Sequence, residues 1–275
     1  MSQPKENYSA KLRAKSMVYF VICIILTLIC LVPIYILIIN ATRKHVDIIS
    51  SVSFIPGSNL AANVKKLLND PMFQFDPFIG FKNSAIIAVG STVLSVFFSA
   101  LTAYGLVVYD FKLRGPAYTF ILVVMMVPMQ VTSVGFLQFM IKLGLSDSFI
   151  PLIVPTIAAP AIVFFMRQYL KSSFPLDIVE AARIDGCGEF RTFLTIAIPM
   201  MKPAIAVQAI FAFIQNWNNF YQPSMILVSR KFEQLTMPMM INMLKSNDKI
   251  ADYGVIYAGI ALSIIPVVVL SLIHI

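Results

Sequence analysis

The stretch E180-A-A-R-I-D-G-C-G-E-F-R-T-F-L-T-I-A-I-P-M-M-K202 separates two strongly apolar segments of the chain. It holds five charged residues between Glu180 and Arg191, although only 12% of the 275 residues are charged and 59% are hydrophobic. So much charge inside so apolar a chain predicts a piece of structure that meets water or a soluble partner. The apolar segments on its two sides determine the fold class.

These apolar segments predict membrane spans. A mean hydropathy of +0.83 and repeated uncharged runs are typical of a polytopic membrane protein. The runs are continuous and do not alternate, which excludes lipid-facing strands and favours helices. We therefore predict an all-α polytopic membrane protein, with an N-terminal tail of residues 1–16 and one transmembrane domain of residues 17–275. The six predicted spans are residues 17–39, 83–109, 117–141, 149–169, 204–228 and 254–275.

The charges outside the spans say little about orientation. With the N-terminus inside, the inner segments hold eleven Lys and Arg residues and the outer segments hold ten, so the positive-inside rule barely separates the two orientations. The net charge of +8 fits contact with anionic lipid, and no soluble basic domain points to nucleic acid. The three cysteines show no metal-site or disulfide spacing.

The charged stretch and the residues before it predict a helix that ends at a glycine. One of the two serines at positions 172–173 is expected to cap its start, and Pro175 suits its first turn. Glu180 precedes Arg183 by three residues, so the two side chains are expected to pair on the helix surface. Gly186 lies where a C-terminal glycine would end the helix.

A second short helix is predicted from Glu189 to Ile198, where Pro199 would stop it. The two helices form a helix–turn–helix elbow within residues 170–203. Helix–helix connections are usually about 2–8 residues long, and longer ones are commonly functional. The adjacent alanines at 181–182 remove bulk from the first helix, so another surface can approach its backbone. The elbow is therefore predicted to be a docking element and not a simple connector.

Several motifs resemble one transporter family. The pattern E180-A-A, then Gly186, then Ile196-x-Ile198-Pro199 resembles the EAA loop of permease subunits from binding-protein-dependent ABC importers, although the usual Leu before the proline is Ile198 here. Such permeases usually carry a short cytoplasmic tail after the sixth span, whereas this sequence stops at Ile275. Further motifs are similar to the carbohydrate-uptake branch, in particular the second permease of maltose-type systems: N83-S, A103-Y-G, F111-K-L-R-G115, M126-V-P-M-Q-V-T132, K142-L-G-L145, F165-M-R-Q-Y-L-K-S-S-F174, W217-N-N-F220 and L235-T-M-P-M239.

This resemblance implies that the elbow couples transport to ATP. In that family the loop lies in a cleft of a cytoplasmic ATPase, so the elbow and both termini are expected on the cytoplasmic side of a prokaryotic cell membrane. The expected partners are a second, homologous permease in a heterodimer, two ATPase subunits that bind ATP and Mg, an extracytoplasmic binding protein, membrane lipid and a sugar. The chain itself is expected to hold no cofactor or metal and to catalyse no reaction. The implied coupling residues are Glu180, Ala181, Ala182, Asp185 and Gly186.

Polar residues inside the predicted spans indicate a path for solute. Uncharged amides beside aromatic rings suit a sugar, because its hydroxyl groups need donors and acceptors while its apolar face stacks on aromatic carbon. The same side chains could instead join helices through hydrogen bonds. The candidate path residues are Gln130, Gln215, Trp217, Asn218, Asn219 and Tyr221.

Three alternative functions differ in their chemistry. A secondary transporter driven by protons or sodium usually places Asp, Glu or His inside spans, and the one candidate here is the terminal His274. A membrane enzyme would need a catalytic motif, but the sequence holds neither H-E-x-x-H nor G-x-S-x-G, and it lacks the ATP-binding P-loop. An importer for another solute, such as glycerol phosphate or a polyamine, keeps the same architecture. A phosphate would require Lys or Arg in the path, and none lies there.

Overall fold

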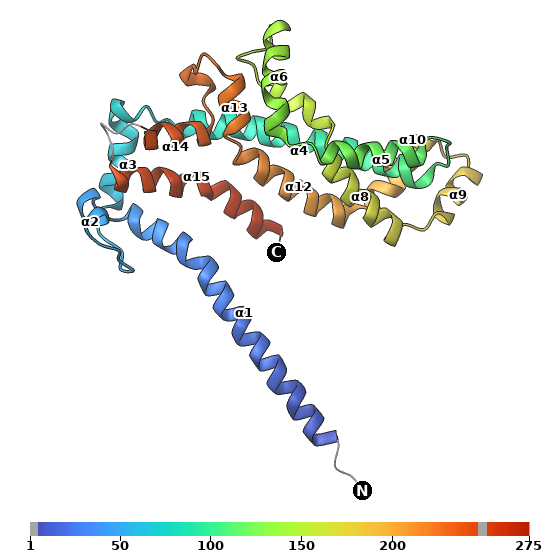
Figure 1. Ribbon diagram of the computed structural model, residues 1–275, viewed down its shortest axis with the longest axis horizontal. Helices are drawn as coiled ribbons and strands as arrows, with labels where there is room; N and C mark the ends of the chain where they lie inside the picture. The colour runs from blue at the N-terminus through green and yellow to red at the C-terminus, as the bar shows by residue number, and fades with distance from the viewer. Residues whose placement is uncertain (1–4, 247–251, 275) are drawn as a thin grey trace. The chain divides into compact units, whose positions relative to one another are not determined.

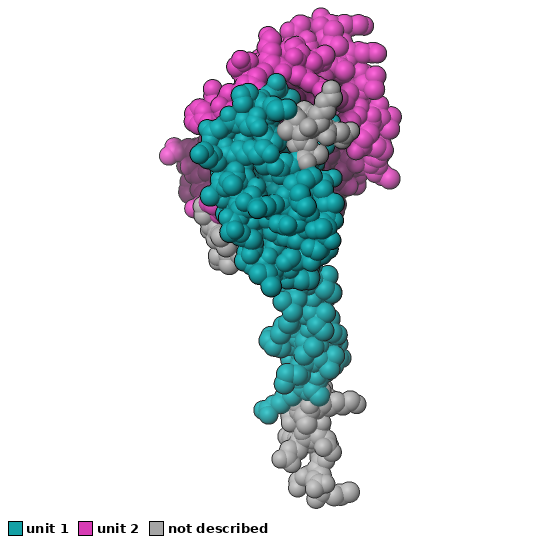
Figure 2. All heavy atoms as spheres, turned by 90° about the vertical axis from the view of Figure 1, so that its left-hand side faces the viewer, with its two compact units in different colours: residues 1–75, 243–264 teal, residues 76–242, 265–275 magenta. Residues whose placement is uncertain are grey.

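The computed structural model describes the backbone of residues 5–246 and 252–274, and the side chains of residues 13–246 and 252–271. Every regular element in these ranges is a helix, which confirms the predicted all-α class. The chain divides into two compact units, residues 1–75 with 243–264 and residues 76–242 with 265–275 (Figure 2). Helices α14 (Met237–Ser246) and α15 (Tyr253–His274) contribute to both units.

Unit 1 begins with a long apolar helix, α1 (Lys5–Ala41, blue in Figure 1). Its membrane-length part, Arg13–Ala41, has 29 residues, or about 44 Å at 1.5 Å per residue, which exceeds the thickness of a bilayer core. Large apolar side chains are exposed along it from Met17 onward, and buried positions begin only at Ile39. A helix that is apolar on every side suits a lipid environment.

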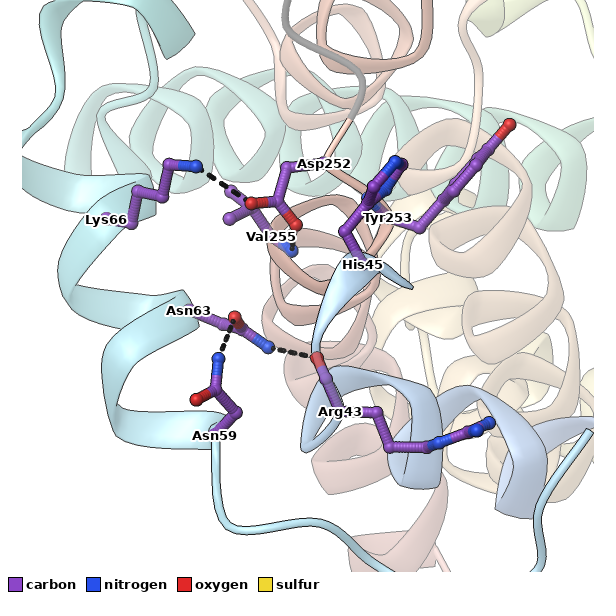
Figure 3. A network of polar contacts seen from close by, with 8 residues as sticks. All are labelled: Arg43, His45, Asn59, Asn63, Lys66, Asp252, Tyr253 and Val255. Atoms are coloured by element: carbon purple, nitrogen blue, oxygen red, sulfur yellow. Dashed lines mark hydrogen bonds and ion pairs between the residues drawn. The ribbon is translucent and has the colours of Figure 1, made fainter. Parts of the chain in front are cut away.

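The other elements of unit 1 are short and are tied together by polar contacts (Figure 3). The buried guanidinium of Arg43 donates to the carbonyl oxygens of Asp47 at 2.6 Å and Ser51 at 2.9 Å. The Asn63 amide donates to the carbonyl oxygens of Ala41 at 2.8 Å and Arg43 at 2.9 Å. The two Asn63 bonds satisfy carbonyls at and just after the end of α1 that have no partner within the helix. The short elements are α2 (His45–Ser50), α3 (Leu60–Asn69) and the 3-10 turn η1 (Pro71–Phe73).

The start of α15 closes this unit. Lys66 of α3 forms an ion pair with Asp252 at 2.8 Å (Figure 3). The backbone N–H of Tyr253 donates to Nδ1 of His45 at 3.1 Å, and the two rings stack with centroids 5.2 Å apart. The next residue is Gly254, which lies so close to the end of α1 that a side chain there has no room.

Replacement of Gly254 by alanine should therefore destabilise unit 1. The added Cβ would lie 2.5 Å from the carbonyl oxygen of Arg43 and 2.7 Å from Nδ2 of Asn63. We expect an overpacking cost of about 1–3 kcal/mol, measured as a lower Tm of the detergent-solubilised protein. Gly115→Ala is the matched control, since no heavy atom lies within 4 Å of a Cβ at that position. Equal Tm values for the two variants would contradict this packing.

Unit 2 is built around α4 (Pro77–Val108), which packs against α8 (Pro160–Ser173) and α12 (Lys202–Trp217) (Figure 1). The Asp76 carboxylate caps α4 by accepting two backbone N–H groups of the first turn at 2.8 and 3.2 Å. The cap and the proline that follows it fix where the helix begins.

One face of α4 carries small buried residues that let other helices approach closely. Ser91, Ser95 and Ser99 recur every fourth residue, and all three are buried. Ser91 donates to the carbonyl oxygen of Leu152 at 3.1 Å, and Ser99 donates to that of Ala159 at 3.4 Å. Small residues combined with hydroxyl-to-backbone bonds are typical of helix packing in membranes.

The number of spans depends on how bent helices are counted. By length and composition, four segments of the described chain could cross a membrane, or up to six if each bent pair is one span. The predicted span 117–141 is bent by 94° at Pro128, since proline lacks an N–H and disfavours helix in the residue before it. The two halves are α5 (Arg114–Met125) and α6 (Met129–Lys142); the predicted span 149–169 consists of α7 (Ile150–Ile153), the 3-10 turn η2 (Val154–Ile157) and α8.

The region of the fifth predicted span also differs from the prediction. Helix α12 ends at Trp217 and not near residue 228. Pro199 does not end the second elbow helix, so this prediction is wrong: the proline lies in the first turn after a π-helical turn, where its missing N–H is tolerated. The bend, of 80°, follows at Met201. The elements here are α10 (Glu189–Thr192), the π-helical turn Phe193–Ala197, α11 (Ile198–Met200), α12, α13 (Tyr221–Ile226) and the 3-10 turn η4 (Phe232–Gln234).

Candidate functional site

The charged elbow contains two short helices joined by a glycine turn. Helix α9 (Asp177–Ile184) ends in a Schellman motif: the Cys187 N–H donates to the Ala182 carbonyl at 2.9 Å and the Gly186 N–H donates to the Arg183 carbonyl at 3.0 Å. Gly186 has a φ of +74°, a conformation that costs a residue with a side chain about 1–2 kcal/mol. The predicted glycine stop is confirmed.

Two details of the predicted elbow are wrong. The serines at 172–173 belong to the end of α8, and the N-cap position of α9 is Leu176, which makes no capping hydrogen bond. Arg183 pairs with Glu189 and not with Glu180: Nε lies 2.7 Å from Oε1, and Nη2 lies 3.2 Å from Oε2. The reason is the glycine turn, which folds α10 back beside α9 and brings the later carboxylate within reach.

A second contact joins the same carboxylate to α4. The hydroxyl of Tyr109, the C-cap residue of α4, donates to Oε2 of Glu189 at 2.7 Å. The Arg183 guanidinium lies 5.7 Å from the centroid of the Tyr109 ring. The hydrogen bonds from Arg183 and from Tyr109 lower the pKa of Glu189 below its ordinary value, so the carboxylate is ionised at neutral pH. Tyr109, Arg183 and Glu189 are referred to below as the elbow clamp.

Beneath the clamp, the elbow rests on a buried aromatic layer. The ring of Tyr104, in α4, lies 5.3 Å from that of Phe193 and 6.2 Å from that of Phe174. Val179 of α9 belongs to the same buried cluster. These contacts hold both elbow helices against the ends of α4 and α8, so the elbow is a packed part of unit 2.

The other side of the elbow faces away from the chain. One of the five predicted coupling residues, Ala182, does not lie on this outer side: only 7% of it is exposed, so it lies on the packed side. Ile184 projects outward with an exposed fraction of 87%, which puts a large apolar side chain on the outer surface. The four predicted coupling residues on that exposed surface are Glu180, Ala181, Asp185 and Gly186.

The two neighbouring alanines should therefore respond differently to added bulk. We expect Ala182→Leu to lower stability by about 1–3 kcal/mol through overpacking. Ala181→Leu should stay within about 0.5 kcal/mol of the parent, because its side chain is exposed. Thermal unfolding in detergent, with limited proteolysis of the elbow as a local probe, measures both. Equal destabilisation by the two variants would contradict the assigned orientation of α9.

A second feature of unit 2 is an open cavity of about 620 Å³ bordered by α4, α6, α7, α8, α12 and α13. None of its lining residues is Asp, Glu, Lys, Arg or His. Within the described ranges, no group of three or more His, Cys, Asp or Glu could hold a metal ion. The lining is therefore uncharged, and polar side chains lie in it among apolar ones. Its polar lining residues are Ser95, Gln130, Thr132, Ser133, Thr156, Gln215, Asn216, Asn219, Tyr221 and Gln222.

Of the six predicted path residues, four line the cavity and two do not. Trp217 is buried at 3% exposure and stacks between Phe81 and Phe213, with centroids 5.9 and 5.6 Å away. Asn218 is exposed and does not line the cavity. The predicted path residues that do line it are Gln130, Gln215, Asn219 and Tyr221.

Six polar lining residues were not among the predicted path residues: Ser95, Thr132, Ser133, Thr156, Asn216 and Gln222. Helical phase would have identified Asn216, because Ala212, Gln215, Asn216 and Asn219 follow the i, i+3, i+4, i+7 spacing of one helix face and all line the cavity. No such signal marks Gln222. It lies in α13, beyond the helix break, and its Oε1 accepts a hydrogen bond from Asn219 at 2.8 Å.

Three interruptions of helix meet at this cavity. They fall at Pro128, at residues 158–159 and at residues 218–220, and each adjoins lining residues. The hydroxyl groups of Ser133 and Tyr221, 2.9 Å apart, join two of the resulting segments. Non-helical backbone is tolerated at membrane depth where it lines a cavity or is buried in protein, and discontinuous helices form substrate sites in many transporters.

Comparison with known proteins identifies relatives over most of the chain. The arabinooligosaccharides transport system permease protein AraQ of Bacillus subtilis (strain 168) is 34% identical over 252 residues, which cover 90% of this chain and 86% of AraQ. The lactose transport system permease protein LacG of Rhizobium radiobacter is 33% identical, covering 70% and 69% of the two chains. The sn-glycerol-3-phosphate transport system permease protein UgpE of Pectobacterium atrosepticum is 28% identical, covering 90% and 88%.

The fold is also that of a solved transporter chain. A crystal structure of a bacterial ABC transporter involved in the import of the acidic polysaccharide alginate contains a chain that matches with a TM-score of 0.77 and 23% identity, covering 95% of each chain. Residues 95–274 match the model of the family described as binding-protein-dependent transport system inner membrane component. The chain therefore belongs to the family of inner membrane components of binding-protein-dependent transport systems.

Proposed function

We propose that this chain is the membrane-spanning permease subunit of an ATP-driven importer that takes up a sugar or oligosaccharide. The observation that supports this function best is the cavity, whose lining is rich in uncharged amide and hydroxyl groups and lies where three helices are interrupted. The names of two relatives, which concern arabinooligosaccharides and lactose, support the same solute class. In this proposal the chain catalyses nothing, and a separate subunit hydrolyses ATP.

The proposed assembly joins this chain to a second, homologous permease, two ATPase subunits and an extracytoplasmic binding protein. The chain crosses a prokaryotic cell membrane six times, with α5 and α6 together forming the third span and α12 and α13 together forming the fifth. The elbow lies on the cytoplasmic side, because that is where the ATPase binds ATP. With an even number of spans, both termini lie on that side as well.

The exposed surface of α9 is the proposed docking site for the ATPase. Glu180 supplies a charge for a basic residue of the ATPase, and Ala181 lets the partner approach the helix backbone. Ile184, with 87% of its surface exposed, adds an apolar contact that becomes buried on docking. Ala182, buried on the opposite side, supports α9 from beneath.

Bulk at Ala181 should therefore block docking without disturbing the fold. In Ala181→Trp the indole would hold the ATPase away from the α9 backbone. We expect ATPase recovery to fall roughly tenfold or more, which corresponds to a loss of about 1.4 kcal/mol of binding free energy. Co-purification of the ATPase with the tagged permease measures it, with membrane insertion checked in parallel. Ala181→Ser is the size control and should recover the ATPase fully. Full recovery with the tryptophan variant would argue against docking at this surface.

The charge of the cavity favours a neutral solute over the two charged alternatives. A relative is named for sn-glycerol-3-phosphate, but a phosphate is bound best by Lys, Arg or a metal ion, and no Lys or Arg lines this cavity. A polyamine would need carboxylates, which are absent from the lining as well. Ion-coupled transporters usually place a carboxylate or His in the path, and neither lines this cavity. A polyhydroxylated sugar matches the amides and hydroxyls that are present.

The neighbouring residues Asn218 and Asn219 allow a matched test of the path. Asn219 lines the cavity and Asn218 does not, so Asn219→Leu should slow uptake whereas Asn218→Leu should not. A buried polar group left unpaired costs about 1–3 kcal/mol, so we expect about a tenfold or larger loss for Asn219→Leu. The assay is ATP-dependent uptake of a panel of labelled sugars by the reconstituted importer. If no sugar is taken up, or if both variants behave alike, the proposed path is wrong.

A further inference from the structure

The elbow clamp connects the proposed docking helix to the helix that borders the cavity. Arg183 comes from α9, Glu189 from α10, and Tyr109 is the C-cap residue of α4. One carboxylate accepts hydrogen bonds from the guanidinium at 2.7 and 3.2 Å and from the phenol at 2.7 Å. The carboxylate thereby joins three elements, although Tyr109 and Glu189 are 80 residues apart in the sequence.

The clamp contributes orientation more than stability. The side chains of Arg183 and Glu189 are 39% and 46% exposed, and exposed ion pairs contribute only about 0–1 kcal/mol. A bidentate guanidinium–carboxylate pair nevertheless fixes how its two partners are oriented. The Tyr109 hydroxyl adds a third fixed point on the same carboxylate, so α9 cannot rotate freely relative to the end of α4.

From the clamp, α4 leads directly to the cavity. Tyr109 donates its backbone N–H to the carbonyl of Gly105 at 3.3 Å, so it continues the hydrogen bonding of the helix. Fourteen residues earlier, Ser95 lines the cavity, a distance of about 21 Å along a helix. Between them, Ala100 and Ala103 are fully buried against the neighbouring helices. The segment is therefore a stiff, packed rod between elbow and cavity.

We propose that Glu189 and Tyr109 are positioning residues for transport, and that the elbow clamp passes a displacement of α9 to α4 and so to the cavity. This inference rests on the proposed docking of the ATPase at α9. The glycine turn at Gly186 leaves the elbow a point of bending, with φ at +74° and no atom within 4 Å of a Cβ there. Without the clamp, α9 keeps its packing contacts at Val179 and Ala182 but loses the oriented polar connection to the end of α4.

The test separates transport from ATP hydrolysis in the complete importer, reconstituted in liposomes with its binding protein. Tyr109→Phe removes one hydroxyl, and Glu189→Gln removes the charge but keeps the shape. For both variants we expect normal ATPase recovery and ATP hydrolysis within about twofold of the parent. The number of sugars taken up per ATP should fall about fivefold or more. A factor of about five is the lower end of typical coupling between two sites of a protein.

Tyr104→Phe is the matched control. Tyr104 lies five residues before Tyr109, in α4, it is buried under the elbow, and its hydroxyl has no hydrogen-bond partner among the residues that the structure describes. Its removal should leave the sugar-to-ATP ratio unchanged. Exchange of the charges separates the two parts of the clamp: Arg183→Glu and Glu189→Arg should each lower the ratio, and the double variant should recover no further than the level of Tyr109→Phe. The exchanged residues form the bidentate pair again, but the carboxylate no longer lies at position 189, where it accepts from the Tyr109 hydroxyl.

Two results would overturn the inference. One is a parental sugar-to-ATP ratio in both Tyr109→Phe and Glu189→Gln. The other is loss of ATPase recovery in both, which would make the clamp a support for the docking surface alone. Failure of the proposed function looks different: the unmodified importer would then take up no sugar with ATP, or Ala181→Trp would bind the ATPase normally.

Discussion

A backbone N–H or carbonyl group inside hydrocarbon has no water to bond, so the chain must supply a partner for each one. The continuous helices meet this requirement by themselves, whereas the interrupted ones rely on side chains. Ser99 of α4 donates to the carbonyl of Ala159, at the break before α8. At the break after α12, Oδ1 of Asn219 accepts the backbone N–H of Gln222 at 3.2 Å. The interruptions therefore occur where polar side chains can bond the free backbone groups, and these side chains lie around the cavity.

The same constraint explains why a side chain can both join helices and line the cavity here. The Ser133 and Tyr221 hydroxyl groups join α6 to α13, yet both residues also border the open volume. Asn219 bonds Gln222 across the helix break and lines the cavity as well. Such bonds keep the helix ends at fixed positions, so the space between them stays open.

The sequence predicted what depends on local pattern and missed what depends on how segments fold back on each other. Continuous apolar runs predicted the helical class, and Gly186 marked the end of α9 because a positive φ favours glycine. The pairing of Arg183 with Glu189 could not be read from helix spacing, since it arises only after the glycine turn. The inward orientation of Ala182 depends in the same way on the aromatic layer beneath α9. The helical phase of Asn216, in contrast, was available in the sequence.

The charges of the elbow divide into two sets with different physical roles. Arg183 and Glu189 satisfy each other, and with Tyr109 they fix the shape of the elbow. Glu180 and Asp185 lie on the exposed side beside Ile184. Exposed charge next to a large exposed apolar side chain is the composition expected of a surface that a soluble partner covers.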